Sequence, residues 1–175
     1  MSEFSESFHL RSDSQQDGED LLRRASLTGA VFSPVRGWVT VVPETEIYEA
    51  VDQMVASNQG LLLHYFYAED HGWQFALYEG NTAICKYECG WDPEFAINDS
   101  EMNQSKLVPL LVEDSCEGAL ESILHPADLD AVIMEPPAYR FANVLGLEHY
   151  EWLSGGYLDE IEERDPKVIM VRRNN

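Results

Sequence analysis

The segment of residues 61–89 constrains the fold most, because it holds three strand-like runs in immediate succession. These runs, at residues 61–67, 73–78 and 83–89, consist mainly of aliphatic and aromatic side chains, which favour extended structure. Only the short polar segments AEDHG and EGNT separate them, and such segments are typical of hairpin turns. The sequence therefore predicts an antiparallel three-stranded meander over about residues 61–89.

Sequence patterns before the meander predict two helices and further strands. Strand-like patterns occur at residues 8–11 and, in two pieces, within residues 30–42. A helix is expected over residues 13–24, because acids occupy its early turns and two arginines lie near its end. Apolar residues at helical spacing within residues 44–60 predict a second helix.

After the meander the sequence is first polar and irregular, and then shows several short helical patterns. We therefore expect a single domain of residues 1–175, with a sheet-forming part at 1–90, a mostly helical part at 103–165 and a final strand at 167–172. The expected class is α+β, with a mainly antiparallel sheet and helices packed on one face. The chain is 45 % hydrophobic, which suffices for a packed core.

Several features indicate a cytoplasmic protein that does not enter the membrane. No apolar run approaches the roughly 20 residues that span a bilayer, and the first ten residues carry acids but no Lys or Arg. The three cysteines suit a reducing compartment. Cys85 and Cys89 lie on one expected strand, where residues four apart are separated by about 13 Å. We therefore expect neither a disulfide nor a zinc site between them.

The charge of the chain limits the partners it can bind. Asp and Glu number 32 against 11 Lys and Arg, which gives a net charge of −21. Residues 61–125 are the most acidic part, with 12 acids and 2 bases. Such a surface repels nucleic acid and attracts a basic protein or a cation. A surface that serves only solubility is the alternative interpretation.

The first functional hypothesis is a non-enzymatic protein that binds a basic protein partner, as an inhibitor or immunity protein does. Its candidate contacts are acids, a histidine and two tryptophans at the meander turns: Glu69, Asp70, His71, Trp73, Trp91, Asp92 and Glu94. Indole rings beside carboxylates suit a Lys or Arg side chain, which gains cation–π and ionic contacts together. The hypothesis requires the acids to gather on one side. Otherwise residues 68–72 are a solvated hairpin loop and both indoles belong to the core.

The second functional hypothesis is a small enzyme or small-ligand-binding domain. It places a pocket between the meander and the C-terminal helices, and its candidate residues are aromatic or titratable: His64, Tyr67, His71, Tyr87, Tyr139 and Trp152. For His64, which lies within a very apolar run, a place in the core is the competing interpretation.

No recognisable motif assigns a reaction, a cofactor or a metal. The sequence lacks GxxxxGK[ST], a GxGxxG that follows a strand, GxSxG and HExxH. Acids and amides at residues 92–101 are oxygen ligands of the kind that calcium prefers, but the central glycine and spacing of an EF-hand loop are missing. We therefore assign no catalytic residue and expect no metal and no cofactor.

Overall fold

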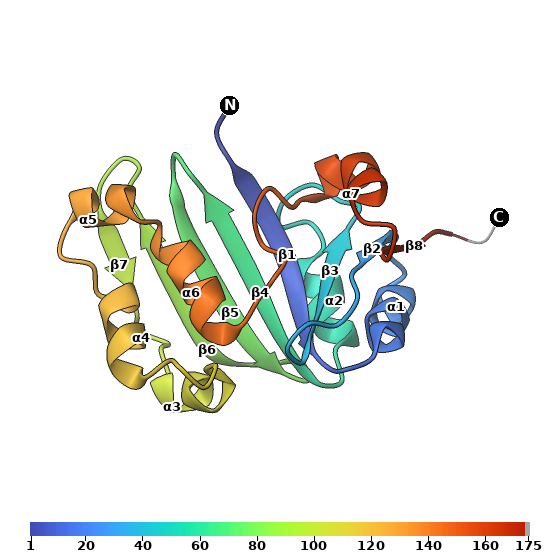
Figure 1. The fold of residues 1–175 in the computed structure, drawn as a ribbon, viewed down its shortest axis with the longest axis horizontal. Coiled ribbons are helices and arrows are strands. Elements are labelled where there is room, and N and C mark those ends of the chain that lie inside the picture. The colour runs from blue at the N-terminus through green and yellow to red at the C-terminus, as the bar shows by residue number, and fades with distance from the viewer. Residues whose placement is uncertain (174–175) are drawn as a thin grey trace.

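The computed structural model describes residues 1–173 and confirms the α+β class. Eight strands form one sheet in the order β7-β6-β5-β4-β1-β3-β2-β8, and every neighbouring pair is antiparallel (Figure 1). The strands are β1 (Phe4–Arg11), β2 (Gly29–Val31), β3 (Trp38–Pro43), β4 (Leu61–Ala68), β5 (Gly72–Glu79), β6 (Thr82–Gly90), β7 (Ala96–Asn98) and β8 (Ile169–Val171).

Seven α-helices lie within the described residues, together with two short 3-10 helices. The α-helices are α1 (Gln15–Arg24), α2 (Val51–Ser57), α3 (Gln104–Leu107), α4 (Glu117–Leu124), α5 (Leu129–Met134), α6 (Pro137–Leu145) and α7 (Leu158–Arg164). The 3-10 helices are η1 (Val108–Leu110) and η2 (Gly155–Tyr157).

The first six elements form the centre of the fold. Their chain order is β1-α1-β2-β3-α2-β4, and their strands lie in the order β4-β1-β3-β2. Each helix therefore connects two strands that have a third strand between them, which is the split β-α-β arrangement of a ferredoxin-like unit. The meander extends this unit beyond β4 through β5 and β6, as the sequence predicted, and β7 adds one more strand. The predicted final strand, β8, lies at the opposite edge.

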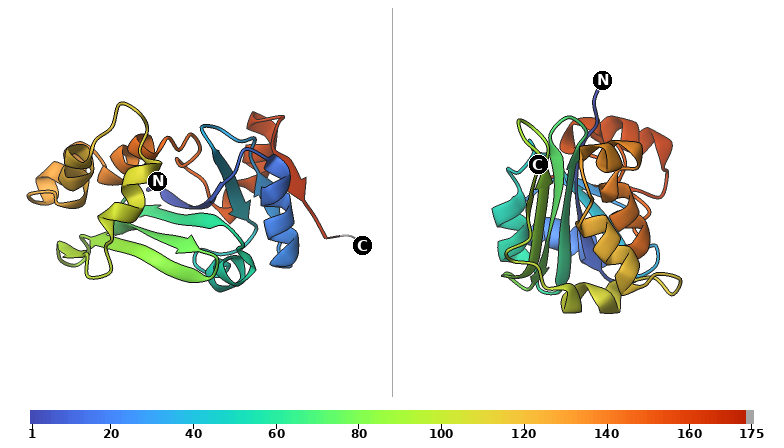
Figure 2. Two further views of the ribbon diagram at one scale, coloured as in Figure 1. Left: turned by 90° about the horizontal axis from the view of Figure 1, so that it is seen from below. Right: turned by 90° about the vertical axis from the view of Figure 1, so that its left-hand side faces the viewer.

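Helices cover both faces of the sheet, so the prediction of helices on one face is wrong (Figure 2). Helices α1 and α2 pack on the face that contains Phe8, Val41 and Leu62, which we call the α1–α2 face. Helices α4 and α6 pack on the opposite face of the meander, which contains Leu63 and Phe75. The physical reason is that the central strands are apolar on both faces, and each apolar face must be covered.

The core under α6 is aromatic. Phe141 of α6 stacks on Phe75 of β5 with ring centroids 4.2 Å apart, and Trp73 lies 5.3 Å from the same ring. Helix α6 begins with a proline at its first turn and ends at Gly146, whose φ of 76° makes the left-handed cap. Both ends of this helix are thus set by local sequence, while its buried face is set by the sheet.

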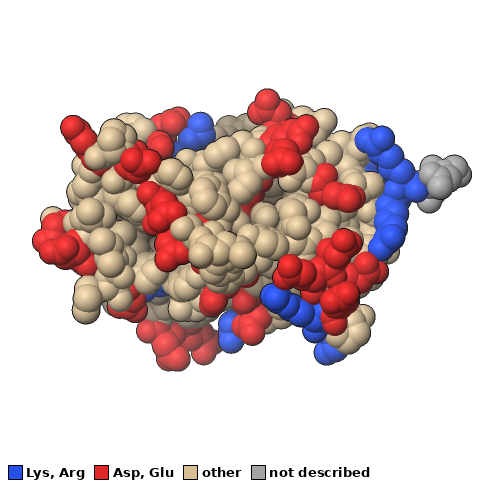
Figure 3. All heavy atoms as spheres, turned by 90° about the horizontal axis from the view of Figure 1, so that it is seen from above, with Lys and Arg blue, Asp and Glu red and all other residues tan. Residues whose placement is uncertain are grey.

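The surface carries acids in several places. On the face shown in Figure 3, Asp and Glu form separate groups with uncharged surface between them, and Lys and Arg gather toward one end. None of the helices in residues 1–173 has both the length and the apolar character needed to cross a membrane.

Candidate functional site

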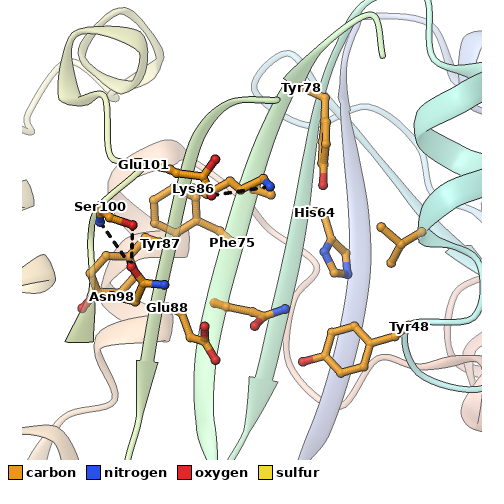
Figure 4. A pocket seen from close by; sticks show the side chains of 13 residues that line it. Tyr48, His64, Phe75, Tyr78, Lys86, Tyr87, Glu88, Asn98, Ser100 and Glu101 are labelled. Carbon is orange, nitrogen blue, oxygen red and sulfur yellow. Dashed lines mark hydrogen bonds and ion pairs between the residues drawn. The ribbon is translucent and has the colours of Figure 1, made fainter. Parts of the chain in front are cut away.

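The α1–α2 face is open over the meander. Helices α1 and α2 cover β1, β2, β3 and β8 and reach only the near side of the meander, at Leu62 and Tyr78. Beyond α2 lies a cavity of about 370 Å³ (Figure 4). We call it the sheet-face pocket, and its lining includes Tyr48, Val51, His64, Gln74, Ala76, Tyr78, Lys86, Glu88, Asn98, Ser100 and Glu101.

Strand register forms the floor of the sheet-face pocket. Side chains of directly paired residues point to the same face, and two cross-strand rows face the cavity: His64–Ala76–Lys86 and Phe66–Gln74–Glu88–Asn98. Ala76 carries only a methyl group between the longer side chains of its row. The hollow therefore lies over the centre of the meander.

A buried carboxylate connects two walls of the pocket. Glu6 of β1 is 6 % exposed, and its Oε1 lies 2.8 Å from Nε2 of His64. Both of its oxygens accept hydrogen bonds from the backbone N–H of Tyr48, at 3.0 and 3.1 Å. Within residues 1–173, every hydrogen-bond partner of the Glu6 side chain therefore belongs to a residue that lines the pocket.

Tyr48 has an unusual backbone conformation. Its φ is 69°, in the left-handed region that is unfavourable for a bulky side chain. Because its N–H is bonded to Glu6, residues 47–50 form a turn and α2 begins only at Val51. The sequence predicted helix within residues 44–60, so this part of the prediction is wrong. Tyr48 remains 45 % exposed, and its ring packs against Phe66 with centroids 4.8 Å apart.

His64 is fixed from two sides. Its ring stacks on Phe8 of β1, with centroids 4.8 Å apart, and Nε2 is held by Glu6. The residue is 3 % exposed, yet it borders the cavity. No hydroxyl or thiol of residues 1–173 is hydrogen-bonded to His64, so a nucleophile paired with this imidazole is not found there.

The charged side chains at the rim of the pocket differ in whether they have a partner. Lys86 forms an ion pair with Glu101, with Nζ and Oε2 3.6 Å apart. Glu88 is exposed, and no ion pair or side-chain hydrogen bond of Glu88 occurs within residues 1–173. Burial, and then the charges of Glu6 and Glu88, raise the pKa of Tyr48. The Tyr48 hydroxyl, which is protonated at neutral pH even at its ordinary pKa, can donate a hydrogen bond.

The predicted location of a pocket, between the meander and the C-terminal helices, is wrong because packed side chains fill that space. Tyr67 and Tyr87 are 5 % and 2 % exposed and belong to the core under α6. The Tyr139 hydroxyl donates a hydrogen bond to buried Glu3, while Trp152 is 38 % exposed and its backbone N–H donates to the same carboxylate. Of the predicted set, His64 and Tyr87 border the sheet-face pocket, which lies on the opposite side of the meander from α6.

The loops predicted to contact a partner do come together. His71 Nδ1 lies 2.8 Å from an Asp92 carboxylate oxygen, and the Trp91 indole N–H donates to the Glu69 carbonyl at 3.0 Å. The cluster is Glu69, Asp70, His71, Trp91, Asp92 and Glu94, which we call the loop cluster; all but the partly buried Trp91 are exposed.

Trp73 cannot belong to that surface. Its side chain is 1 % exposed, and it packs against Tyr87 and Phe141 in the core. The prediction that Trp73 contacts a partner is therefore wrong. The physical reason is its place on β5, where it shares a face with Phe75 and Leu77 beneath α6.

The sequence predicted neither Glu6, which supports the pocket, nor most of the lining residues, among them Tyr48, Gln74 and Glu88. The predicted first strand began at residue 8, whereas β1 begins at Phe4 and includes Glu6. The alternation of Phe4, Glu6, Phe8 and Leu10 was a signal for this longer strand, and it places Glu6 on an apolar face. No comparable signal marks Tyr48, because a contact with a residue 42 positions away determines its conformation.

Comparison with protein-family models, with curated proteins and with solved structures finds no significant match. The part of the chain that the structure describes also holds no group of three or more His, Cys, Asp or Glu side chains placed to bind a metal ion.

Proposed function

We propose that this protein binds a small molecule, and that the sheet-face pocket is its binding site. The observation that carries the proposal is Glu6, a buried carboxylate whose partners, His64 and Tyr48, both line the pocket. A buried polar group of this kind holds in position the side chains that contact a ligand.

Stability alone is a poor explanation for Glu6. Removal of a carboxylate from water costs several kcal/mol, and apolar replacements of buried ion pairs are often neutral or stabilising by about 1–4 kcal/mol. The neighbours of Glu6 on this face include Phe8 and Phe66, so the carboxylate lies among apolar side chains. The positive φ of Tyr48 adds a further cost of order 1–3 kcal/mol. Both costs are explained if the arrangement serves ligand binding.

The size of the cavity suits a small ligand. Its volume of about 370 Å³ lies within the usual range of ligand sites. At about 30 Å³ per water molecule, it corresponds to about twelve waters. A molecule of roughly a dozen non-hydrogen atoms would therefore fill it.

A fragment titration followed by ¹H–¹⁵N NMR tests the proposal. Fragments that bind should shift the amide signals of Gln74, Ala76 and Glu88 in the wild type. Gln74→Trp places an indole in the cavity at a half-buried strand position, where tryptophan is well tolerated, and it should abolish these shifts. Gln16→Trp, the same change at an exposed position of α1, should leave them unchanged.

Two results would overturn the proposal. One is a fragment screen in which no compound shifts the pocket signals at millimolar concentration. The other is a set of shifts that persists in Gln74→Trp, since binding would then occur elsewhere.

A second candidate function is the binding of a basic protein at the loop cluster. The specific observation in its favour is that the His71–Asp92 contact joins two loops across 21 positions of sequence and places several acids at one end of the sheet. Because the attraction is electrostatic, a partner should bind at least tenfold more weakly at 500 mM than at 50 mM salt. A partner with equal affinity at both salt concentrations, or with equal affinity for Asp92→Asn, would contradict it.

A further inference from the structure

The sheet-face pocket has an aromatic ring at one side and an unpaired carboxylate at the other. Tyr48 and Glu88 lie on opposite sides of the cavity (Figure 4). The Tyr48 ring packs over Phe66, and in the cross-strand row Phe66 is followed by Gln74 and then by Glu88. Two strand spacings, about 10 Å, separate the backbones of Phe66 and Glu88 in this row.

We infer that the ligand of this pocket is a small organic cation, whose ammonium or guanidinium group lies over Gln74 between Tyr48 and Glu88. The inference rests on the proposed function and names its ligand class. An ion pair spans about 4 Å, and a phenol hydroxyl oxygen can accept a hydrogen bond from an N–H group. In Figure 4 the Tyr48 hydroxyl points toward the Glu88 side of the cavity, so a cation between the two residues can meet both groups.

The charges of the pocket select for a cation. The ammonium of Lys86 is already paired with Glu101, and Glu88 has no cationic partner within residues 1–173. Glu6 adds a second negative charge behind His64. An anionic ligand would meet these carboxylates and the net charge of −21, whereas a cation would be steered toward them.

The polar groups of the floor complete the fit. Gln74 is half-buried and provides an amide oxygen that accepts a hydrogen bond from N–H groups. Asn98 pairs with Glu88 across β6 and β7 and provides a second amide at the rim. An ammonium has three N–H donors and a guanidinium has five, so either can donate to Glu88 and Gln74 together.

The test compares two probes that differ in charge. Phenethylamine is a cation at pH 7, and 2-phenylethanol has nearly the same shape without the charge. Titrations monitored by NMR should give an affinity for phenethylamine at least tenfold higher, with shifts at Gln74, Ala76 and Glu88. Glu88→Gln should remove that preference, because it removes the charge and keeps the shape. Glu163→Gln, which removes one exposed acid on α7, should preserve it.

The outcomes separate this inference from the proposed function. If 2-phenylethanol shifts the same signals with equal affinity, the pocket binds ligands but the cation inference is wrong. If Glu88→Gln leaves the preference for phenethylamine intact, the inference is equally overturned. If neither probe shifts the pocket signals while other, uncharged fragments do, the cation inference fails and the proposed function stands. If no fragment of any kind shifts them, both fail.

Discussion

Replacement of His9 by glutamine should flatten the decline in stability of this protein between pH 8 and pH 4.5. His9 lies on β1 and is 0 % exposed. Its Nε2 is 2.9 Å from the Ser7 hydroxyl, and its Nδ1 is 3.0 Å from the Thr40 hydroxyl. Burial, and then the charges of His149 and His64, lower the pKa of His9 from 6.5 to about 3.

The sign and size of the effect follow from this shift. At any pH between about 3 and 6.5 the unfolded chain binds a proton at His9 that the folded chain does not bind. Stability therefore falls as the pH falls below 6.5, by up to roughly 1.4 kcal/mol per pH unit. Between pH 8 and pH 4.5 the loss due to His9 should reach about 3 kcal/mol, and it should level off near pH 3.

Urea unfolding followed by tryptophan fluorescence measures the effect. The difference in free energy of unfolding, wild type minus His9→Gln, should fall by about 3 kcal/mol from pH 8 to pH 4.5. Groups that do not interact with His9 cancel in this difference.

His125→Gln provides a control of opposite sign. A hydrogen bond with Asp99 raises the pKa of exposed His125, so its contribution is present below pH 6.5 and is lost as the pH rises through the folded pKa. A wild-type minus His9→Gln difference that stays constant from pH 8 to pH 4.5 would refute the reasoning.

Three further substitutions test other parts of the structure, each by urea unfolding. Glu6→Ala should destabilise the fold by about 1–3 kcal/mol, because the Tyr48 N–H and His64 Nε2 lose their partner. An unchanged free energy of unfolding would show that these contacts of the Glu6 carboxylate do not stabilise the fold. Tyr139→Phe should cost about 1–2 kcal/mol through the lost hydrogen bond to Glu3, and should cost nothing further in a Glu3→Ala background. Phe141→Ala should cost about 3–5 kcal/mol, whereas an effect below 1 kcal/mol would contradict the packing under α6.

Much of the fold could be predicted because its signals are local. The meander is encoded by apolar runs that are joined by short polar turns. The second covered face was not predicted, although the run from Leu62 to Ala68 is buried at every position. Such a run requires cover on both sides of the sheet, and alternation alone does not reveal it.

The site was harder to predict from the sequence, because it depends on contacts between residues that are far apart in the chain. Glu6 meets His64 across 58 positions of sequence, and the turn at Tyr48 replaces a helical pattern through its bond to Glu6. Trp73 and Trp91 resemble one another in sequence context, but one packs beneath α6 and the other remains partly exposed. Which side of the meander stays open is decided by the lengths of α1 and α2 and by where α6 packs.

The most direct test of a ligand site on the open face of the meander is the measurement of intermolecular NOEs to a bound ligand. In a complex with phenethylamine, or with another fragment that binds, ligand protons should show NOEs to the Tyr48 ring and the Ala76 methyl group. These two groups border the same cavity and come from different parts of the chain. NOEs confined to the loop cluster or to the α6 side of the sheet would contradict the account.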